Sequence, residues 1–285
     1  MIPASFEYHA PTTLDEAVRL LADAGDEAKL LAGGQSLLPV LRLRLAAPEV
    51  VVDLGRVDEL RGIREDGDTL VIGAMTPHAE VAASDVVRRH ATVLSEAAAT
   101  VADPQVRHRG TIGGAIAHAD PAGDMPAPVL ALGGELVVAG PGGRRTVPAD
   151  DFFEDLFTTA LGDDEILAEV RIPSHQGWGG HYAKFTRVAQ QWSIVAVAAA
   201  VRTEGGSIAE AKVALTNMGS TAVRAGAVEQ ALVGAEPTDE AVRAAAAQAA
   251  EGTSPPSDIN GDADFRRNLA TVLTRRAVLA AAGGA

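Results

Sequence analysis

The sequence predicts an α+β fold that is divided into three segments, residues 1–56, 57–175 and 176–285. Short apolar runs typical of strands recur along the whole chain, and helix-like stretches separate them. Two Gly-Gly pairs each stand between a strand-like run and a helix-like run. A chain of 285 residues can form one large domain or two to three small ones with well-filled cores.

The first segment is predicted to begin with a strand at residues 6–9, where aromatic and polar side chains alternate. Thr13 and Glu16 have the spacing of a capping box, so a helix is expected to start there and to end at Gly25. The elements that follow are a strand at 29–32, the Gly33-Gly34 pair, a helix at 35–45 and a strand at 50–54.

The second segment alternates strands and helices around a glycine-rich stretch at 109–124. Its predicted strands are 70–72, 136–139, 144–147 and 165–172, and its predicted helices are 76–81 and 84–100. The last of these strands stops at Pro173, because proline has no backbone N–H to continue a ladder.

The third segment is predicted to be a small α/β domain that combines a three-stranded sheet with helices. The strands are 181–188, 194–202 and 208–215, and the helices are 223–232, 240–250 and 264–282. A polar linker at 253–258, which contains two prolines, separates the last two helices.

The composition excludes several classes of protein. The sequence has no cysteine, which excludes disulfides, thiolate zinc sites, cysteine nucleophiles and any iron–sulfur cluster held by this chain alone. A net charge of −14 argues against a nucleic-acid partner, which requires a basic surface. We expect no transmembrane segment, because no run of eighteen apolar residues occurs, and we expect a cytoplasmic protein, because the first residues do not have the pattern of a signal peptide.

The two Gly-Gly pairs carry the strongest chemical signal. Glycine lets the backbone approach a ligand closely, and consecutive free N–H groups can bind phosphate oxygens without a Lys or Arg. Ser36 and Thr111 flank the pairs as hydroxyl donors, and Asp124 follows as an acceptor for a ribose hydroxyl. Two such loops that converge on one long ligand suit a dinucleotide. The alternative is that each pair is an ordinary turn in a chain with 29 glycines. The motifs of the Rossmann fold and of the P-loop are absent.

Long ordered motifs resemble one family over nearly the whole chain. They include AGGQSLLP at 32–39, IGAMTPHAEV at 72–81, DPQVRHRGTIGGAIAHADPAGDMPA at 103–127 and GGRRTVPADDFF at 142–153. The family is the FAD-binding medium subunit of the molybdenum hydroxylases, which includes the medium subunit of aerobic carbon monoxide dehydrogenase and the flavin domain of xanthine dehydrogenase. The resemblance implies a two-subdomain FAD-binding module of the PCMH/VAO-like type, and a C-terminal domain whose motifs are TAVRAGAVEQAL at 221–232 and DFRRNLATVLTRRA at 264–277.

The resemblance also implies the residues that bind FAD. The first glycine loop would lie on the pyrophosphate with Lys29, Leu30, Leu31, Ala32, Gly33, Gly34, Gln35, Ser36 and Leu37. The second loop and the stretch before it would contribute Val101, Ala102, Val106, Gly110, Thr111, Gly113, Gly114, Ala117 and His118. Asp124 corresponds to an aspartate that contacts the sugar of FAD. Leu161, Ile166, Lys184 and Trp192 correspond to residues beside the flavin ring. No catalytic residue and no metal site are expected in this chain.

Two departures from the family pattern occur in these motifs. Gln35 replaces a histidine that carbon monoxide-oxidising members carry, which weakens the assignment of that substrate. Gln190 and Gln191 replace a Gly-Asp pair that many relatives have before the aromatic residue.

The resemblance implies an electron-transfer role in a heterotrimer, as the flavoprotein component of an oxidoreductase. The large subunit would bind molybdopterin, and a small subunit with [2Fe–2S] clusters would pass electrons to this FAD. NAD or a quinone is the expected acceptor, in a complex like carbon monoxide dehydrogenase or like xanthine or aldehyde dehydrogenase. The alternative is a stand-alone FAD- or nucleotide-binding module without turnover. A self-contained flavin oxidase would need an acid–base pair that the sequence does not suggest.

Overall fold

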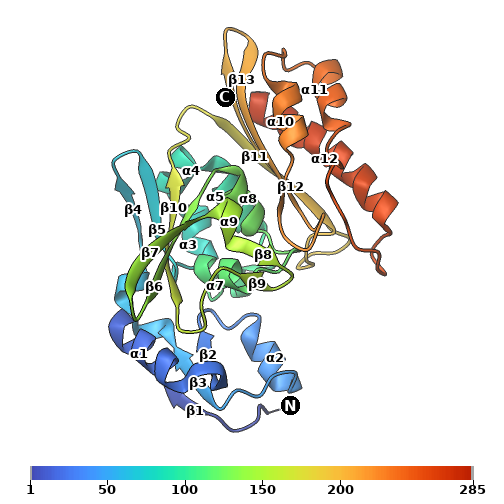
Figure 1. The fold of residues 1–285 in the computed structure, drawn as a ribbon. Helices are drawn as coiled ribbons and strands as arrows, with labels where there is room; N and C mark the ends of the chain where they lie inside the picture. Colours follow the sequence, from blue (N-terminus) through green and yellow to red (C-terminus); the bar gives the residue numbers. More distant parts are fainter. Residues whose placement is uncertain (1, 284–285) are drawn as a thin grey trace.

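The structure is a computed structural model that describes residues 2–283 and confirms the α+β fold (Figure 1). The first segment forms a parallel sheet in the order β1-β3-β2, from Glu7–His9, Val50–Asp53 and Ala28–Leu31. Helix α1 (Leu14–Ala24) starts at the predicted capping box, where the Thr13 hydroxyl accepts a hydrogen bond from the N–H of Glu16. Its apolar stripe packs against the sheet, and helix α2 (Leu37–Leu43) follows the first glycine pair. Short 3-10 turns are Gly25–Glu27, Leu54–Arg56 and Asp58–Leu60.

The second segment is built on an antiparallel five-stranded sheet in the order β4-β5-β10-β6-β7. These strands are Ile63–Asp66, Thr69–Gly73, Ile166–Pro173, Glu135–Gly140 and Gly143–Pro148. The helices are α3 (His78–Ala83), α4 (Asp85–His90), α5 (Thr92–Thr100), α6 (Pro104–Arg107), α7 (Ile112–His118), α8 (Pro126–Ala131) and α9 (Ala149–Phe152). A hairpin of β8 (Phe153–Asp155) and β9 (Thr158–Thr159) projects beside α7 (Figure 1).

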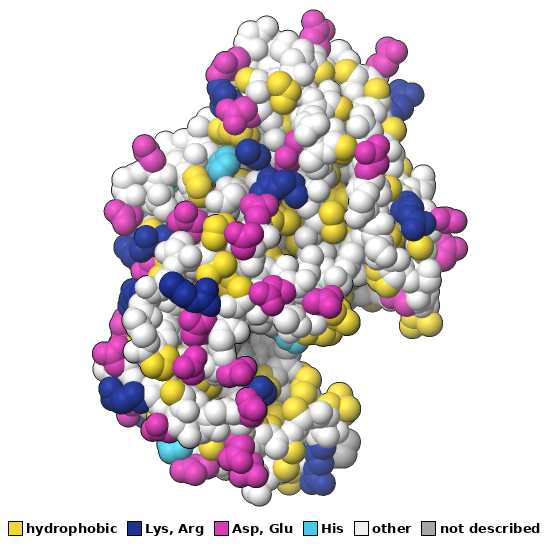
Figure 2. Space-filling model, in the orientation of Figure 1, with side chains coloured by type: hydrophobic (Ala, Val, Ile, Leu, Met, Phe, Trp, Pro, Cys, Tyr) yellow, Lys and Arg dark blue, Asp and Glu magenta, His cyan; other side chains and the backbone are white. Residues whose placement is uncertain are grey.

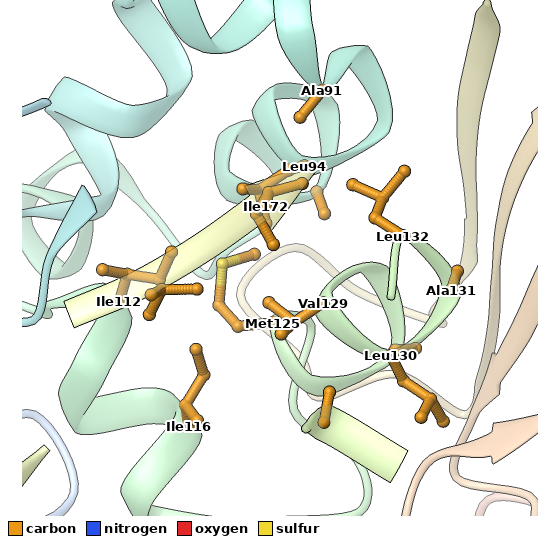
Figure 3. Packing of buried hydrophobic residues seen from close by; sticks show 14 of the residues in the cluster. Ala91, Leu94, Ile112, Ile116, Met125, Val129, Leu130, Ala131, Leu132 and Ile172 are labelled. Carbon is orange, nitrogen blue, oxygen red and sulfur yellow. The ribbon is translucent and has the colours of Figure 1, made fainter. Parts of the chain in front are cut away.

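The core of this segment lies between the sheet and the helices. Figure 3 shows Met125 pointing among Ile112, Val129 and Ile172, which come from α7, α8 and β10. Met125 is fully buried, so the residue before it, Asp124, is held at the edge of a packed core.

The third segment forms an antiparallel sheet in the order β11-β12-β13-β14. These strands are Gly179–Phe185, Val195–Glu204, Ser207–Thr216 and Val223–Arg224, and the helices are α10 (Gly226–Leu232), α11 (Asp239–Ala246) and α12 (Ala263–Gly283). The sequence of β12 shows how the sheet is placed. Val195, Val197, Ala199 and Val201 face the helices of this segment, and the alternate residues Ala196, Ala198 and Ala200 face the core of the second segment. Small alanines on that face let α5 and α8 pack closely against the sheet.

Several elements differ from those the sequence predicts. The sheet of the third segment has four strands, because Val223 and Arg224 pair with Leu215 and Ala214 where a helix was expected to begin. The helix expected at 84–100 is broken at Ala91, whose backbone is not helical (φ −154°, ψ 61°). Strands β4, β8 and β9 and helices α6 and α8 were not predicted.

The second glycine pair also lies differently from the prediction. It belongs to the first turn of α7 instead of a loop before a helix, because the Thr111 hydroxyl caps the helix through the N–H of Gly114. Among residues 2–283, no helix has the length and apolar character needed to cross a membrane.

Candidate functional site

The two glycine motifs meet in the structure although nearly eighty positions separate them. A Cβ atom placed on Gly33 would lie 2.6 Å from the Cα of Gly110 and 2.9 Å from the carbonyl carbon of Arg109, and it would overlap the Arg109 oxygen. Only glycine therefore allows the first loop to touch the second at this point. Gly114 approaches the first loop too, because a Cβ there would lie 3.3 Å from the Cβ of Ala32.

The first loop presents unused backbone donors. Within residues 2–283, the N–H groups of Gly33, Gly34, Gln35 and Ser36 donate to no protein acceptor. Gly34 adopts a left-handed conformation (φ +74°), and the Gln35 side chain donates to the Gly33 carbonyl over 3.1 Å. Because Gly33 and Gly34 are buried as residues, their two N–H groups need an acceptor that the protein does not supply. A phosphate-bearing ligand offers such acceptors.

The second loop uses most of its own donors to hold its shape. The N–H groups of Gly110, Ile112 and Gly113 donate to the carbonyls of Val106, Thr76 and Ala74, over 2.7, 3.0 and 2.8 Å. A Cβ on Gly113 would lie 2.7 Å from the Cα of Ala74, so α7 packs directly on the end of β5. The second loop is therefore held in place by its own hydrogen bonds, and the first loop contributes the free N–H groups.

His78 lies beneath the second loop and is a site residue that the sequence analysis did not select. Its side chain is buried and packs on Gly110, and its backbone N–H donates to the Gly110 carbonyl over 2.9 Å. The Nδ1 atom is buried without a hydrogen-bond partner. Burial, with help from the nearby Arg107 charge, lowers the pKa of His78 to about 4, so the ring is neutral at pH 7. His78 precedes Gly110 by 32 positions in the sequence, so no local pattern could have signalled their contact.

Asp124 is buried and bound by three protein donors. The hydroxyls of Tyr182 and Ser193 donate to Oδ1 over 2.9 and 2.8 Å, and the ammonium group of Lys184 donates to Oδ2 over 2.7 Å. Burial raises the pKa of Asp124, and the Lys184 charge and these hydrogen bonds oppose that rise. All three donors belong to the third segment, so this cluster joins it to the second.

The structure places Asp124 and Lys184, two predicted site residues, in one ion pair. Their side chains are 4% and 10% exposed, and the ammonium group also donates to the Thr100 carbonyl. The sequence suggested that Asp124 accepts from a ribose hydroxyl, whereas in the structure its acceptors already serve Tyr182, Ser193 and Lys184. Asp124 and Lys184 are about sixty positions apart, so no local pattern in the sequence could predict their ion pair.

The remaining predicted residues lie at varied positions around the loops. Val101 and Ala102 precede α6, and their carbonyls accept from Arg107. Ala102 has a left-handed backbone (φ +38°), which is uncommon for alanine. His118 ends α7 and stacks on Phe157 of the β8–β9 turn, with ring centroids 5.1 Å apart.

The other predicted residues divide into buried and exposed groups. Ile166 is 1% exposed in the core against which Ala32 packs, while Leu161 packs at the edge of a different core cluster. Trp192 is 54% exposed, in the loop that joins β11 to β12. The last predicted residues lie in the elements that flank the two loops: Lys29, Leu30 and Leu31 in β2, Leu37 at the start of α2, Val106 in α6 and Ala117 in α7.

Figure 2 shows that one face of the molecule is hollowed between the lobe that carries α2 and the lobe that carries α7. The two glycine motifs belong to these two lobes, and hydrophobic side chains line much of the lower side of the gap. The arrangement fits an elongated ligand that runs between the two lobes.

Comparisons with known proteins agree on one family. Residues 4–175 match the model for the FAD binding domain in molybdopterin dehydrogenase, and residues 180–281 match the model for the CO dehydrogenase flavoprotein C-terminal domain. The chain is 46% identical to the carbon monoxide dehydrogenase medium chain of Hydrogenophaga pseudoflava, over 99% of this chain and 98% of that protein. It is 38% identical to the nicotine 6-hydroxylase medium subunit of Paenarthrobacter nicotinovorans, over 98% of each.

A solved structure gives the same result for the fold. In carbon monoxide dehydrogenase from Hydrogenophaga pseudoflava that lacks the Mo-pyranopterin moiety, one chain superimposes with a TM-score of 0.96. That chain is 48% identical, and the match covers 99% of both chains.

Proposed function

Since the chain belongs to the FAD-binding medium subunits of the molybdenum hydroxylases, we propose that it binds FAD between its first two segments and transfers electrons between a partner's iron–sulfur clusters and an external acceptor. FAD is the cofactor of the family, and its members are subunits of oxidoreductases. The observation that carries the proposal is the contact of Gly33 with Arg109 and Gly110, beside four unused N–H groups.

The residues present fit FAD. A pyrophosphate needs several convergent N–H donors and a backbone with no Cβ in the way, and residues 33–36 supply both. No Lys or Arg is required for such a site, which agrees with the acidic character of the chain. When bound, FAD supplies the exchange of one or two electrons, which lets one-electron clusters serve a two-electron acceptor.

In this proposal, the chain's own residues bind FAD and orient it. The N–H groups of Gly33, Gly34, Gln35 and Ser36 hold the pyrophosphate, and the second loop fixes their position through Gly110 and Gly114. Lys184 lies at the junction of the second and third segments, where its charge is neutralised by Asp124. Trp192 and Leu161 are proposed neighbours of the flavin ring.

The partners belong to the proposal as well. Carbon monoxide dehydrogenase and nicotine 6-hydroxylase medium subunits are named as parts of larger enzymes, so we propose a molybdopterin-binding large subunit and a [2Fe–2S] small subunit. The chain has no cysteine, so the clusters must lie in a partner. NAD or a quinone is the proposed acceptor, and a cytoplasmic location is proposed and can be tested by fractionation.

The boundaries of the segments are proposed at 1–56, 57–175 and 176–285. One core cluster draws mostly on residues 14–60, and another lies wholly within 183–281. The third lies mainly within 70–172, and alanines of β12 and β13 complete it.

The test is to express the chain with and without candidate large and small subunits and to measure FAD content and acceptor reduction. The proposal expects about one FAD per chain and reduction of NAD or a quinone only in the complex. Substrate oxidation by the isolated chain would contradict it. A chain that keeps FAD but joins no partner and reduces no acceptor would favour the stand-alone binding module.

A further inference from the structure

Asn217, to which neither the sequence analysis nor the comparisons give a role, connects the loop at 119–124 with the loop at 186–193. It follows β13 and has a left-handed backbone (φ +61°), a conformation in which Asn is enriched. Its backbone N–H donates to the Pro121 carbonyl over 2.7 Å. Its side-chain amide donates to the carbonyls of Ser193 and Ile194 over 2.8 and 3.3 Å.

Ser193 is the residue on which these contacts converge. Its carbonyl accepts from Asn217, its hydroxyl donates to Asp124 over 2.8 Å, and its N–H donates to the Ala122 carbonyl over 3.4 Å. All polar groups of this buried residue are therefore bonded, and the backbone that leads into Trp192 is fixed from one side.

The loop at 186–193 has few other restraints. The N–H of Ile194 donates to the Phe185 carbonyl and closes its ends. In its middle, the Gln191 side chain accepts from the Arg187 N–H and donates to Asn260, each over 2.9 Å. Val188 and Trp192 are 64% and 54% exposed, and Gln190 has a left-handed backbone (φ +68°). Loss of the hydrogen bonds from the Asn217 amide to the Ser193 and Ile194 carbonyls would therefore loosen the end of the loop that carries Trp192.

The loop at 119–124 links this arrangement to the second glycine motif. It starts at Ala119, the left-handed residue that ends α7, and it contains Pro121, the acceptor for Asn217, and ends at Asp124. An unbroken path of covalent and hydrogen bonds thus runs from α7 through Asn217 to Ser193 and Trp192.

We propose that Asn217 is a positioning residue, which fixes the Trp192 loop against the 119–124 loop and thereby sets how Trp192 meets the bound cofactor. This inference rests on the proposed function, because Trp192 is a proposed neighbour of the flavin ring. Asn217 itself need not touch the cofactor.

The test uses the full chain with Trp178→Phe, which leaves Trp192 as the single tryptophan. Asn217→Gly keeps the left-handed backbone and the N–H to Pro121, and it removes only the side-chain amide. Asn217→Asp keeps the shape but replaces the donor by an acceptor that faces two carbonyls. Arg44→Gly is the matched control, because Arg44 is also left-handed (φ +57°) and lies at the end of α2.

Two readouts separate positioning from general stability. Acrylamide quenching of Trp192 in the chain without FAD is expected to rise in both Asn217 variants and to stay unchanged in the control. With added FAD, Asn217→Gly is expected to bind roughly tenfold more weakly, because the loop that the lost amide hydrogen bonds had fixed must then be ordered on binding. The visible circular dichroism of the bound flavin is expected to change as well.

The outcomes distinguish the inference from the proposed function. Unchanged quenching, FAD affinity and visible circular dichroism in Asn217→Gly would overturn the inference. A parent chain that binds no added FAD would refute the proposed function, and the quenching experiment would still decide whether Asn217 holds the loop. A variant with a lower melting temperature but wild-type quenching would also overturn the inference, because Asn217 would then have only a general structural role.

Discussion

Gly33→Ala is the most direct perturbation of the contact between the glycine motifs. The new methyl group would lie 2.6 Å from the Cα of Gly110, where ordinary contact begins at 3.4 Å, and it would overlap the Arg109 carbonyl oxygen. These neighbours are backbone atoms, so the two loops must separate by about 1 Å. Gly33 does not have a left-handed backbone, and the substitution therefore tests the contact alone.

The magnitude follows from two effects. Overpacking of this kind costs about 1–3 kcal/mol of the free energy of unfolding. A shift of about 1 Å also takes N–H donors out of hydrogen-bond range, and two lost bonds to a charged phosphate weaken FAD binding by about a hundredfold or more. The loss of affinity is therefore expected to exceed what the loss of stability alone would cause.

The assay is a titration of the purified chain with FAD, together with urea unfolding of the same samples. Gly142→Ala is the control, because a Cβ at Gly142 meets nothing within 4 Å and its backbone is not left-handed. Wild-type FAD affinity in Gly33→Ala would refute the convergence of the two loops on the cofactor. Equal losses in both variants would show that the effect is not specific to the contact.

Three further predictions concern other parts of the site. Gly114→Val, whose Cβ would lie 2.8 Å from the Thr111 hydroxyl, is expected to lose FAD during purification while remaining folded, and full occupancy would contradict this. Lys184→Met leaves the Asp124 carboxylate buried without its ion-pair partner, so urea unfolding should show a loss of about 3–5 kcal/mol in the free energy of unfolding. The double variant with Asp124→Asn should recover much of this loss, and no recovery would argue against the ion pair. The pKa of His78 is about 4 in the folded chain and near 6.5 in the unfolded chain, so the unfolded chain binds more protons between these pH values. The free energy of unfolding therefore falls as the pH drops through that window, by up to about 3 kcal/mol. His78→Leu should make urea midpoints less dependent on pH there, and an unchanged slope would refute the buried neutral ring.

Elements with local signals were predictable from the sequence. The capping box at Thr13 predicted the start of α1, because the donors it satisfies lie three residues away. The continuous apolar run at 194–201 predicted a buried strand, which is β12, although not that its two faces would pack in two different cores. The glycine motifs could also be found from the sequence, because a close approach between two backbones requires glycine, which no other amino acid replaces.

Features that depend on distant residues were not predictable. The break at Ala91 has no Gly or Pro to mark it, and it coincides with buried contacts of His90 to Ser174 and Glu65. The strand at Val223–Arg224 forms because Arg224 reaches the Leu130 carbonyl on α8, which no local pattern encodes. Likewise the Asp124–Lys184 pair and the contacts of Asn217 connect positions tens of residues apart, and only the folded chain brings them together.

The visible absorption spectrum of the purified chain, with chromatography of the released cofactor, tests the central claim most directly. The account predicts a flavin spectrum and the release of FAD, in a ratio of about one per chain. A colourless chain that also binds no added FAD would contradict the two-loop site, even with the fold unchanged.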